Sequence, residues 1–261
     1  MVIVSKDVKW VKFEVAEKFM VDVFQAVGVP KADAEVCAEV LITADKHGID
    51  SHGVGRFKPI YIDRILQGIQ KPVTKFDVVK DSPATAVIDG NHGMGHVIGV
   101  KAMQMAIDKA KKYGIGMTVV RNSTHYGIAG YYPLMAIKNG MAGMTGTNAR
   151  PSIAPTWGVE NMLGTNPLTV GFPSDDPFPF LIDCATSITQ RGKIEMYDRA
   201  GIETPAGLVI DENGNTRTDT KQILIDLTKG KAALTPLGGP GETLGGYKGY
   251  GYAAVVEIMS A

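Results

Sequence analysis

Two stretches near the start of the chain carry apolar residues at helical spacing. The first covers residues 11–27 and stops at the sequence Gly28-Val29-Pro30, and the second covers residues 31–44. Residues 60–66 show the same spacing and predict another helix. The glycine-punctuated segment 48–55 is therefore expected to connect two helices.

After residue 75 the pattern changes to alternating strands and helices. β-Branched residues crowd positions 76–88, a helix is predicted over 97–113, and the apolar run 115–120 predicts the next strand. The other expected elements are a helix at 132–139, strands at 141–147, 167–172 and 180–182, a hairpin tip at 211–215 and a helix at 252–259. This alternation predicts an α/β fold.

The composition indicates a globular chain with a small-molecule partner. Its 261 residues include 27 Lys plus Arg and 27 Asp plus Glu, so no global field favours nucleic acid or an anionic membrane surface. No apolar run is long enough to cross a bilayer, and the first residues lack the pattern of a secretory signal. Cys37 and Cys184 are too few for a disulfide framework. A cytoplasmic protein without nucleic-acid or membrane partners is expected.

The segment between the predicted helices is rich in side chains that can hold and protonate a small acid. One short stretch contains a hydroxyl, an imidazole, a guanidinium and a phenol. They belong to Ser51, His52, Arg56 and Tyr61, respectively. His125 follows a predicted strand, and strand ends are where α/β folds place their chemistry. If the two segments converge, the imidazoles can exchange protons near neutral pH and the guanidinium can grip a carboxylate.

A dinucleotide loop is one interpretation of the glycine-rich segment after residue 88. Gly93, Gly95 and Gly99 read G-x-G-x-x-x-G between a predicted strand and a predicted helix. The Rossmann fingerprint differs by one residue and needs an acidic group at the end of the next strand, where this chain has Arg121. We therefore favour a glycine-rich helix entry.

Neither a metal site nor a hydrolase is expected. His92 and His96 stand four residues apart, but His92 precedes the predicted helix and no third ligand is in view. Ser51 and His52 are adjacent in sequence. Neighbouring side chains are expected to point apart instead of forming the aligned hydrogen bond of nucleophilic catalysis.

Residues 183–187 follow an apolar strand and carry small polar side chains. Such a string suits the close approach of a ligand, and it equally suits a polar cap on the following helix. Nothing nearby is placed to lower the pKa of the Cys184 thiol, so a catalytic cysteine is not favoured. On the residues alone, the ligand and cap interpretations both stay open.

Motifs spread across nearly the whole chain match one family in that family's order. They are residues 50–53 with Arg56 and Tyr61, 88–90 with 93–99, 123–127, 146–148, 164–167, 183–187 with 191–193, and 236–239 with 246–251. With these motifs the chain resembles the malate/L-lactate dehydrogenase family that is unrelated to the Rossmann-type lactate and malate dehydrogenases. Its members include sulfolactate, ureidoglycolate and diketogulonate oxidoreductases and cyclic imino acid reductases.

By that resemblance the fold is a three-layer α/β/α arrangement around a mixed sheet, not a Rossmann fold, with an N-terminal helical region. Residues 1–75, joined by 230–261, would form the substrate and dimer region, and residues 76–229 the dinucleotide-binding domain. The active unit would be a homodimer. Family members continue past the length of this chain, so we expect their C-terminal tail to be absent here.

The resemblance also implies roles for individual residues. Ser51, Arg56 and Tyr61 would bind the substrate, and His52 and His125 would be catalytic, with His52 favoured as the proton donor. The residues implied in cofactor binding are His125, Asn148, Asp183, Ala185 and Thr186.

The function implied is an NAD(P)-dependent oxidoreductase that interconverts a small 2-hydroxy acid of malate or lactate type and its 2-oxo acid. Hydride transfer would accompany His-mediated proton transfer. Two alternatives stay open: a reductase of a cyclic C=N bond, and a cofactor-binding protein without turnover. The choice between NAD and NADP is open as well, with Arg121 and Arg150 as candidates for binding a 2′-phosphate.

Overall fold

The described chain, residues 10–260 of a computed structural model, divides into two units. The N-terminal unit comprises residues 10–145 and 169–182, and the C-terminal unit comprises residues 146–168 and 183–260. In this division the N-terminal helices belong with the first sheet, and the C-terminal segment belongs to the other unit. The assignment of substrate and cofactor roles to whole domains stays a prediction.

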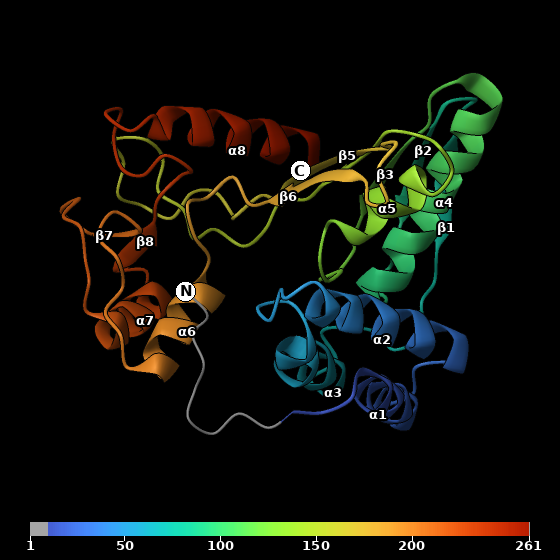
Figure 1. The fold of residues 1–261 in the computed structure, drawn as a ribbon, viewed down its shortest axis with the longest axis horizontal. Helices are drawn as coiled ribbons and strands as arrows, with labels where there is room; N and C mark the ends of the chain where they lie inside the picture. Colours follow the sequence, from blue (N-terminus) through green and yellow to red (C-terminus); the bar gives the residue numbers. More distant parts are fainter. Residues whose placement is uncertain (1–9, 261) are drawn as a thin grey trace. The chain divides into compact units, whose positions relative to one another are not determined.

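Helices α1 (Phe13–Ala26) and α2 (Lys31–Lys46) confirm the first two predicted helices, and they pack side by side (Figure 1). Gly28 turns the chain between them with a φ of +93°, a conformation that glycine adopts at little cost. Their apolar faces share one buried core, in which Phe24 meets the ring of Phe57 edge to face at 4.9 Å. This core holds both ends of the loop that follows α2.

Three short helical elements follow that loop. They are a 3₁₀ turn, η1 (Val54–Arg56), a π-helix, η2 (Phe57–Ile62), and the α-helix α3 (Asp63–Leu66). The helix expected over residues 60–66 is present, but it starts earlier and opens as a π-helix. Such turns are rare and occur often at functional sites. Tyr61 lies in the π-helix η2 and is fully buried.

A mixed sheet forms from β1 (Asp77–Asp81), β2 (Thr85–Asp89) and β3 (Met117–Arg121). β1 runs antiparallel to β2, and β2 runs parallel to β3 because helix α4 (Gly95–Tyr113) crosses between them (Figure 1). The Thr118 hydroxyl donates to the Ala102 carbonyl of α4 at 3.0 Å. The expected α/β class is thereby confirmed, and the glycine-rich segment enters a helix as predicted.

The strands expected farther along the chain are also present. Helix α5 (Tyr131–Ile137) precedes β4 (Gly143–Gly146), β5 (Leu168–Phe172) and β6 (Phe180–Cys184), which form a second three-stranded sheet in that order. Each of these strands contains a boundary between the two units.

The C-terminal unit is built on a two-stranded sheet and three helices (Figure 1). Its elements are α6 (Arg191–Ala200), β7 (Val209–Asp211), α7 (Thr220–Lys229), β8 (Ala232–Leu234) and α8 (Gly246–Ser260). Its core contains Ile153, Ile194 and Ile223. The turn predicted at 211–215 is present, since the Asp211 carboxylate accepts the backbone N–H of Asn213 at 2.9 Å. Helix α8 begins earlier than expected.

Residues 10–260 offer neither a helix that could span a membrane nor a cluster of metal-binding side chains. No helix in that range combines the length and the apolar character that a membrane span needs. No three His, Cys, Asp or Glu side chains in that range come together as a metal site.

Candidate active site

The loop after α2 is shaped by a carboxylate that sequence reasoning missed. Asp45, near the end of α2, accepts the backbone N–H of Val54 at 2.8 Å. A Cβ at Gly53 would lie 1.9 Å from an oxygen of the same carboxylate, so a side chain there requires the carboxylate to move. Partial burial, more than any other cause, raises the pKa of Asp45. Asp45 thus fixes the path of residues 51–56.

Within this loop the chain curls back on itself. Nε of Arg56 donates to the carbonyl oxygen of Ser51 at 2.7 Å, and the hydroxyl of Ser51 lies 3.0 Å from Nδ1 of His52. The expectation that the Ser51 and His52 side chains point apart is therefore wrong. It assumed an extended backbone, whereas these residues lie in a turn, where successive side chains can converge.

Tyr61 and His125, which are 64 residues apart, form a direct hydrogen bond. The phenol oxygen lies 2.5 Å from Nδ1 of His125, and the backbone N–H of Gly127 donates to the same nitrogen at 3.3 Å. Burial raises the pKa of Tyr61 well above its usual value, so the phenol keeps its proton. The convergence of the two segments is therefore a property of the N-terminal unit.

The two candidate catalytic imidazoles stack on one another. The ring centroids of His52 and His125 are 5.8 Å apart, and the two ring planes are 18° from parallel. Loss of solvation lowers the pKa of His125 to about 3, and the nearby His52, Arg64 and Arg56 act in the same direction. His125 is therefore a neutral imidazole at physiological pH, although part of its surface stays exposed.

The segment that carries His125 is tied to the start of helix α4. The hydroxyl of Thr124 accepts the backbone N–H of Gly95 at 3.0 Å and donates to the carbonyl of Gly93 at 2.7 Å. A Cβ at Gly95 would approach the carbonyl oxygens of Thr124 and His125 to 2.4 Å. The glycine-rich sequence therefore lets the helix begin in contact with the His125 segment.

A third histidine, His96, lies behind Tyr61. Its ring is fully buried, with its centroid 4.5 Å from that of Tyr61, and neither ring nitrogen has a hydrogen-bond partner in the structure. Burial lowers the pKa of His96 to about 3, with His125 as the second cause. A neutral aromatic ring thus supports the inner face of the Tyr61 phenol.

The implied cofactor residues other than His125 belong to the C-terminal unit, whereas the implied substrate residues belong to the N-terminal unit. Glu257 of α8 bridges two asparagines, since one carboxylate oxygen accepts from Asn148 at 3.1 Å and the other from Asn166 at 2.9 Å. Thr186 is buried and donates to the Asn166 carbonyl at 2.9 Å. Asp183 is exposed at the end of β6, and Ala185 follows it half-buried.

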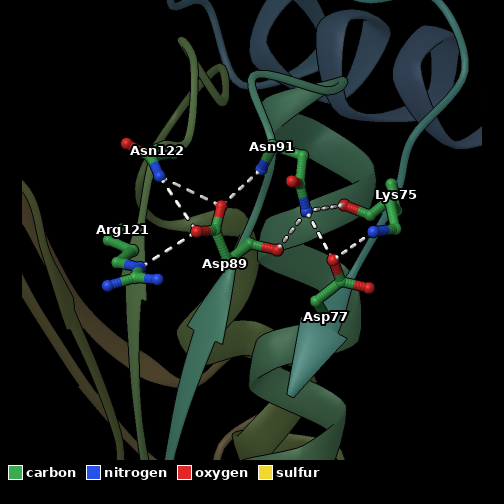
Figure 2. A network of polar contacts seen from close by, with 6 residues as sticks. All are labelled: Lys75, Asp77, Asp89, Asn91, Arg121 and Asn122. Carbon is green, nitrogen blue, oxygen red and sulfur yellow. Dashed lines mark hydrogen bonds and ion pairs between the residues drawn. The ribbon is translucent and has the colours of Figure 1, made fainter. Parts of the chain in front are cut away.

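Arg121, one candidate for a 2′-phosphate, has a carboxylate partner in its own unit. Its Nε donates to Asp89 at 2.9 Å, and Asp89 also accepts from the Asn122 amide at 3.0 Å and the Asn91 backbone N–H at 2.9 Å (Figure 2). The Asn91 contact is the largest cause of the lowered pKa of Asp89. Arg150, the other candidate, is exposed. Binding of a 2′-phosphate by either stays a prediction.

Sequence reasoning missed Asp45 of the N-terminal unit and Glu257 of the C-terminal unit, and it considered the buried His96 only as half of a metal pair. Arg64, which it also missed, lies one turn beyond Tyr61, and it has no ion-pair partner among residues 10–260. A surface groove of about 890 Å³ runs along α4, but none of the candidate residues lines it. The candidate residues are therefore grouped by their side-chain contacts and do not lie in that groove.

The chain is similar to proteins of one family. The family model described as malate/L-lactate dehydrogenase matches residues 11–261. The malate dehydrogenase of Pyrococcus horikoshii is 47% identical over 242 residues, 93% of this chain and 65% of that protein. The L-sulfolactate dehydrogenase of Methanocaldococcus jannaschii is 42% identical over 250 residues, 96% of this chain and 68% of that protein. A crystal structure of malate dehydrogenase from Entamoeba histolytica matches with a TM-score of 0.95 at 48% identity, covering 97% of this chain and 70% of that one. The chain thus spans 65% to 70% of the length of these relatives.

Proposed function

We propose a function for this chain on the basis that it belongs to the malate/L-lactate dehydrogenase family. The chain interconverts a small 2-hydroxy acid and its 2-oxo acid with a nicotinamide cofactor. The curated relatives are named as dehydrogenases of malate and of sulfolactate, which are both 2-hydroxy acids. We therefore take malate and similar acids as the first substrates to test.

The observation that carries the proposal is the contact between Tyr61 and His125 beside His52. A phenol, two imidazoles, a hydroxyl and a guanidinium meet within one unit, although they come from separate segments. An oxidoreductase acting on a hydroxy acid needs these groups: a cation for the carboxylate, a proton carrier for the hydroxyl and donors for the developing alkoxide.

The roles follow from the chemistry of each side chain. The Arg56 guanidinium would bind the substrate carboxylate, since its planar donors match the two carboxylate oxygens. The Ser51 hydroxyl would hold His52 in place through the 3.0 Å contact to Nδ1. His52 would take the hydroxyl proton during oxidation and return it during reduction.

The donor set of the C-terminal unit fits the uncharged polar parts of a nicotinamide nucleotide. Ribose hydroxyls and a carboxamide can form hydrogen bonds with three groups of this unit. These groups are the side-chain amide of Asn148, the carboxylate of Asp183 and the backbone around Ala185. When bound, the cofactor supplies or accepts the hydride. We keep NAD and NADP as alternatives, because the guanidinium of Arg121 is paired with Asp89.

A homodimer and a cytoplasmic location complete the proposal. The sheet of β4, β5 and β6 exposes Met144, Phe172, Phe180 and Ile182, and apolar patches of this kind are often covered by a partner. Light scattering on a sizing column measures the oligomeric state. A monomer at all accessible concentrations would contradict this part of the proposal alone.

The test is the fall in absorbance of NADH, and separately of NADPH, with oxaloacetate, pyruvate, glyoxylate or a cyclic imino acid. We expect turnover with a 2-oxo acid, and Arg56→Met should raise the KM for that acid by about 10-fold to 100-fold, the size of one charge-assisted pair. The matched control is Arg199→Met, on an exposed position of α6. Turnover of the cyclic imino acid alone, or no turnover with any acid, would contradict the proposed function.

A further inference from the structure

The two hydrogen bonds that reach Nδ1 of His125 fix the tautomer of its ring. The backbone N–H of Gly127 points at this nitrogen at 3.3 Å, and a backbone N–H can only donate. The phenol of Tyr61 lies 2.5 Å away on the same nitrogen and, being protonated, has an O–H to donate. Nδ1 is therefore an acceptor without a proton.

The single ring proton of a neutral imidazole must then be on Nε2. Among residues 10–260, no protein group forms a hydrogen bond with Nε2 of His125, whereas Nδ1 has both contacts. The ring consequently presents an N–H, and not a lone pair, on the side away from Tyr61. This arrangement makes His125 unsuited to removing a proton from a substrate.

We propose that His125 is a neutral hydrogen-bond donor, which holds the substrate oxygen through Nε2–H while His52 alone exchanges the proton. This inference rests on the proposed function and assigns different duties to its two imidazoles. As a carbonyl oxygen gains charge during reduction, a fixed N–H stabilises it without transferring the proton.

His52 differs from His125 in the kind of group that its Nδ1 meets. That group is the hydroxyl of Ser51 at 3.0 Å, which can donate to a bare nitrogen or accept from a protonated one. The hydrogen bond therefore survives when His52 gains or loses a proton. At His125 one partner of Nδ1 is the backbone N–H of Gly127, which can donate but cannot accept. A proton on Nδ1 would therefore face another N–H.

The surroundings of His125 also disfavour a positive charge on its ring. The charged groups acting on it are His52 from the loop, Arg56 from η1 and Arg64 from α3, all of which are cations when charged. Behind Tyr61, α4 contributes the neutral ring of His96. Tyr61 itself is a neutral phenol. Among residues 10–260, no carboxylate is a cause of the shift in the pKa of His125.

The kinetic test compares His125→Gln with His125→Ala. The amide of glutamine can place an N–H near the former position of Nε2 but cannot serve as an acid or base near neutral pH. We expect His125→Gln to retain kcat to within about 10-fold and His125→Ala to lose about 100-fold to 1,000-fold, as when one donor to an oxyanion is removed. The pH dependence of kcat/KM should persist in His125→Gln and disappear in His52→Gln.

Nitrogen NMR of the wild-type chain with labelled histidine tests the tautomer without any turnover. We expect a proton coupled to Nε2 and none on Nδ1 of His125 from about pH 5 to about pH 8. A proton on Nδ1, or equal losses in the Gln and Ala variants with the pH dependence abolished in both, would overturn the inference. If the spectrum agrees but no acid is turned over, the tautomer stands and the proposed function fails.

Discussion

The carboxylate of Asp45 occupies the space that a side chain at Gly53 would need, with Oδ1 1.9 Å from the position of a Cβ. Its other oxygen accepts the backbone N–H of Val54 at 2.8 Å. The loop of residues 51–56 is thus held by a half-buried carboxylate of helix α2 that fills the space beside a glycine. Because the contact is specific to one glycine, it can be broken by adding one methyl group.

We predict that Gly53→Ala displaces the Asp45 carboxylate and lowers the free energy of unfolding by about 1–3 kcal/mol, the range for breaking a satisfied polar contact. Urea denaturation measures this change. Gly55→Ala is the matched control, because a Cβ there would meet only the Asp50 carbonyl at an ordinary 3.5 Å. Equal effects of the two substitutions would show that Asp45 does not set the path of the loop.

The second prediction concerns stability at low pH. His96 and His125 have folded pKa values of about 3, below the ordinary value of 6.5, so the unfolded chain binds protons first as the pH falls. Above about pH 6.5, each imidazole should therefore leave the free energy of unfolding unchanged. Below about pH 6.5, each should reduce the free energy of unfolding by up to about 1.4 kcal/mol for each pH unit.

His96→Leu should remove one of these two contributions and make the free energy of unfolding less dependent on pH between about 6.5 and 4.5. His47→Leu, which removes an exposed histidine after α2, is measured in parallel as the control. Denaturation at a series of pH values gives the slopes. An unchanged slope in His96→Leu would mean that the buried ring does not resist protonation.

The third prediction addresses the carboxylate of Glu257, which accepts from Asn148 at 3.1 Å and from Asn166 at 2.9 Å. Glu257→Gln replaces one acceptor by a donor that faces an amide N–H. The free energy of unfolding should fall by about 1–3 kcal/mol, and cofactor affinity should fall with it if Asn148 binds the nucleotide. Glu242→Gln, at an exposed position, is the control for fluorescence titrations and denaturation. Unaltered stability would contradict the bridging role.

The fourth prediction concerns Arg64, whose charge acts on both Tyr61 and His125. Arg64→Met should raise the pKa of His125, because a nearby positive charge disfavours the imidazolium. Arg64→Lys keeps the charge and should leave that pKa closer to the wild-type value. The ring signals of His125 followed by NMR during acid titration decide between them. A pKa that is the same in Met and Lys variants would show that Arg64 points elsewhere.

Periodic patterns predicted the helices well, because helices α2 and α4 bury one face each and their sequences record it. The same logic does not extend to contacts within a loop. Ser51 and His52 converge because the backbone turns there, and turn geometry depends on Asp45, whose side chain lies in a neighbouring helix.

The candidate site was predictable where the residue type itself is chemically distinctive. Two histidines, an arginine and a tyrosine stood out in the sequence, and the contact between Tyr61 and His125 joins the two segments. Asp45 and Glu257 could not be found this way, because each is one of 27 acidic residues and only the fold shows what it accepts from. His96 was noticed as half of a metal pair, whereas burial gives it a packing role.

The double hydrogen bond of Thr124 has a mechanical consequence. Because its hydroxyl is bonded to both Gly93 and Gly95, the residue before His125 is attached to the first turn of a 19-residue helix. Displacing the imidazole would require breaking that attachment or moving the helix as well. The His125 ring therefore stands on a loop but is held with the stiffness of a helix.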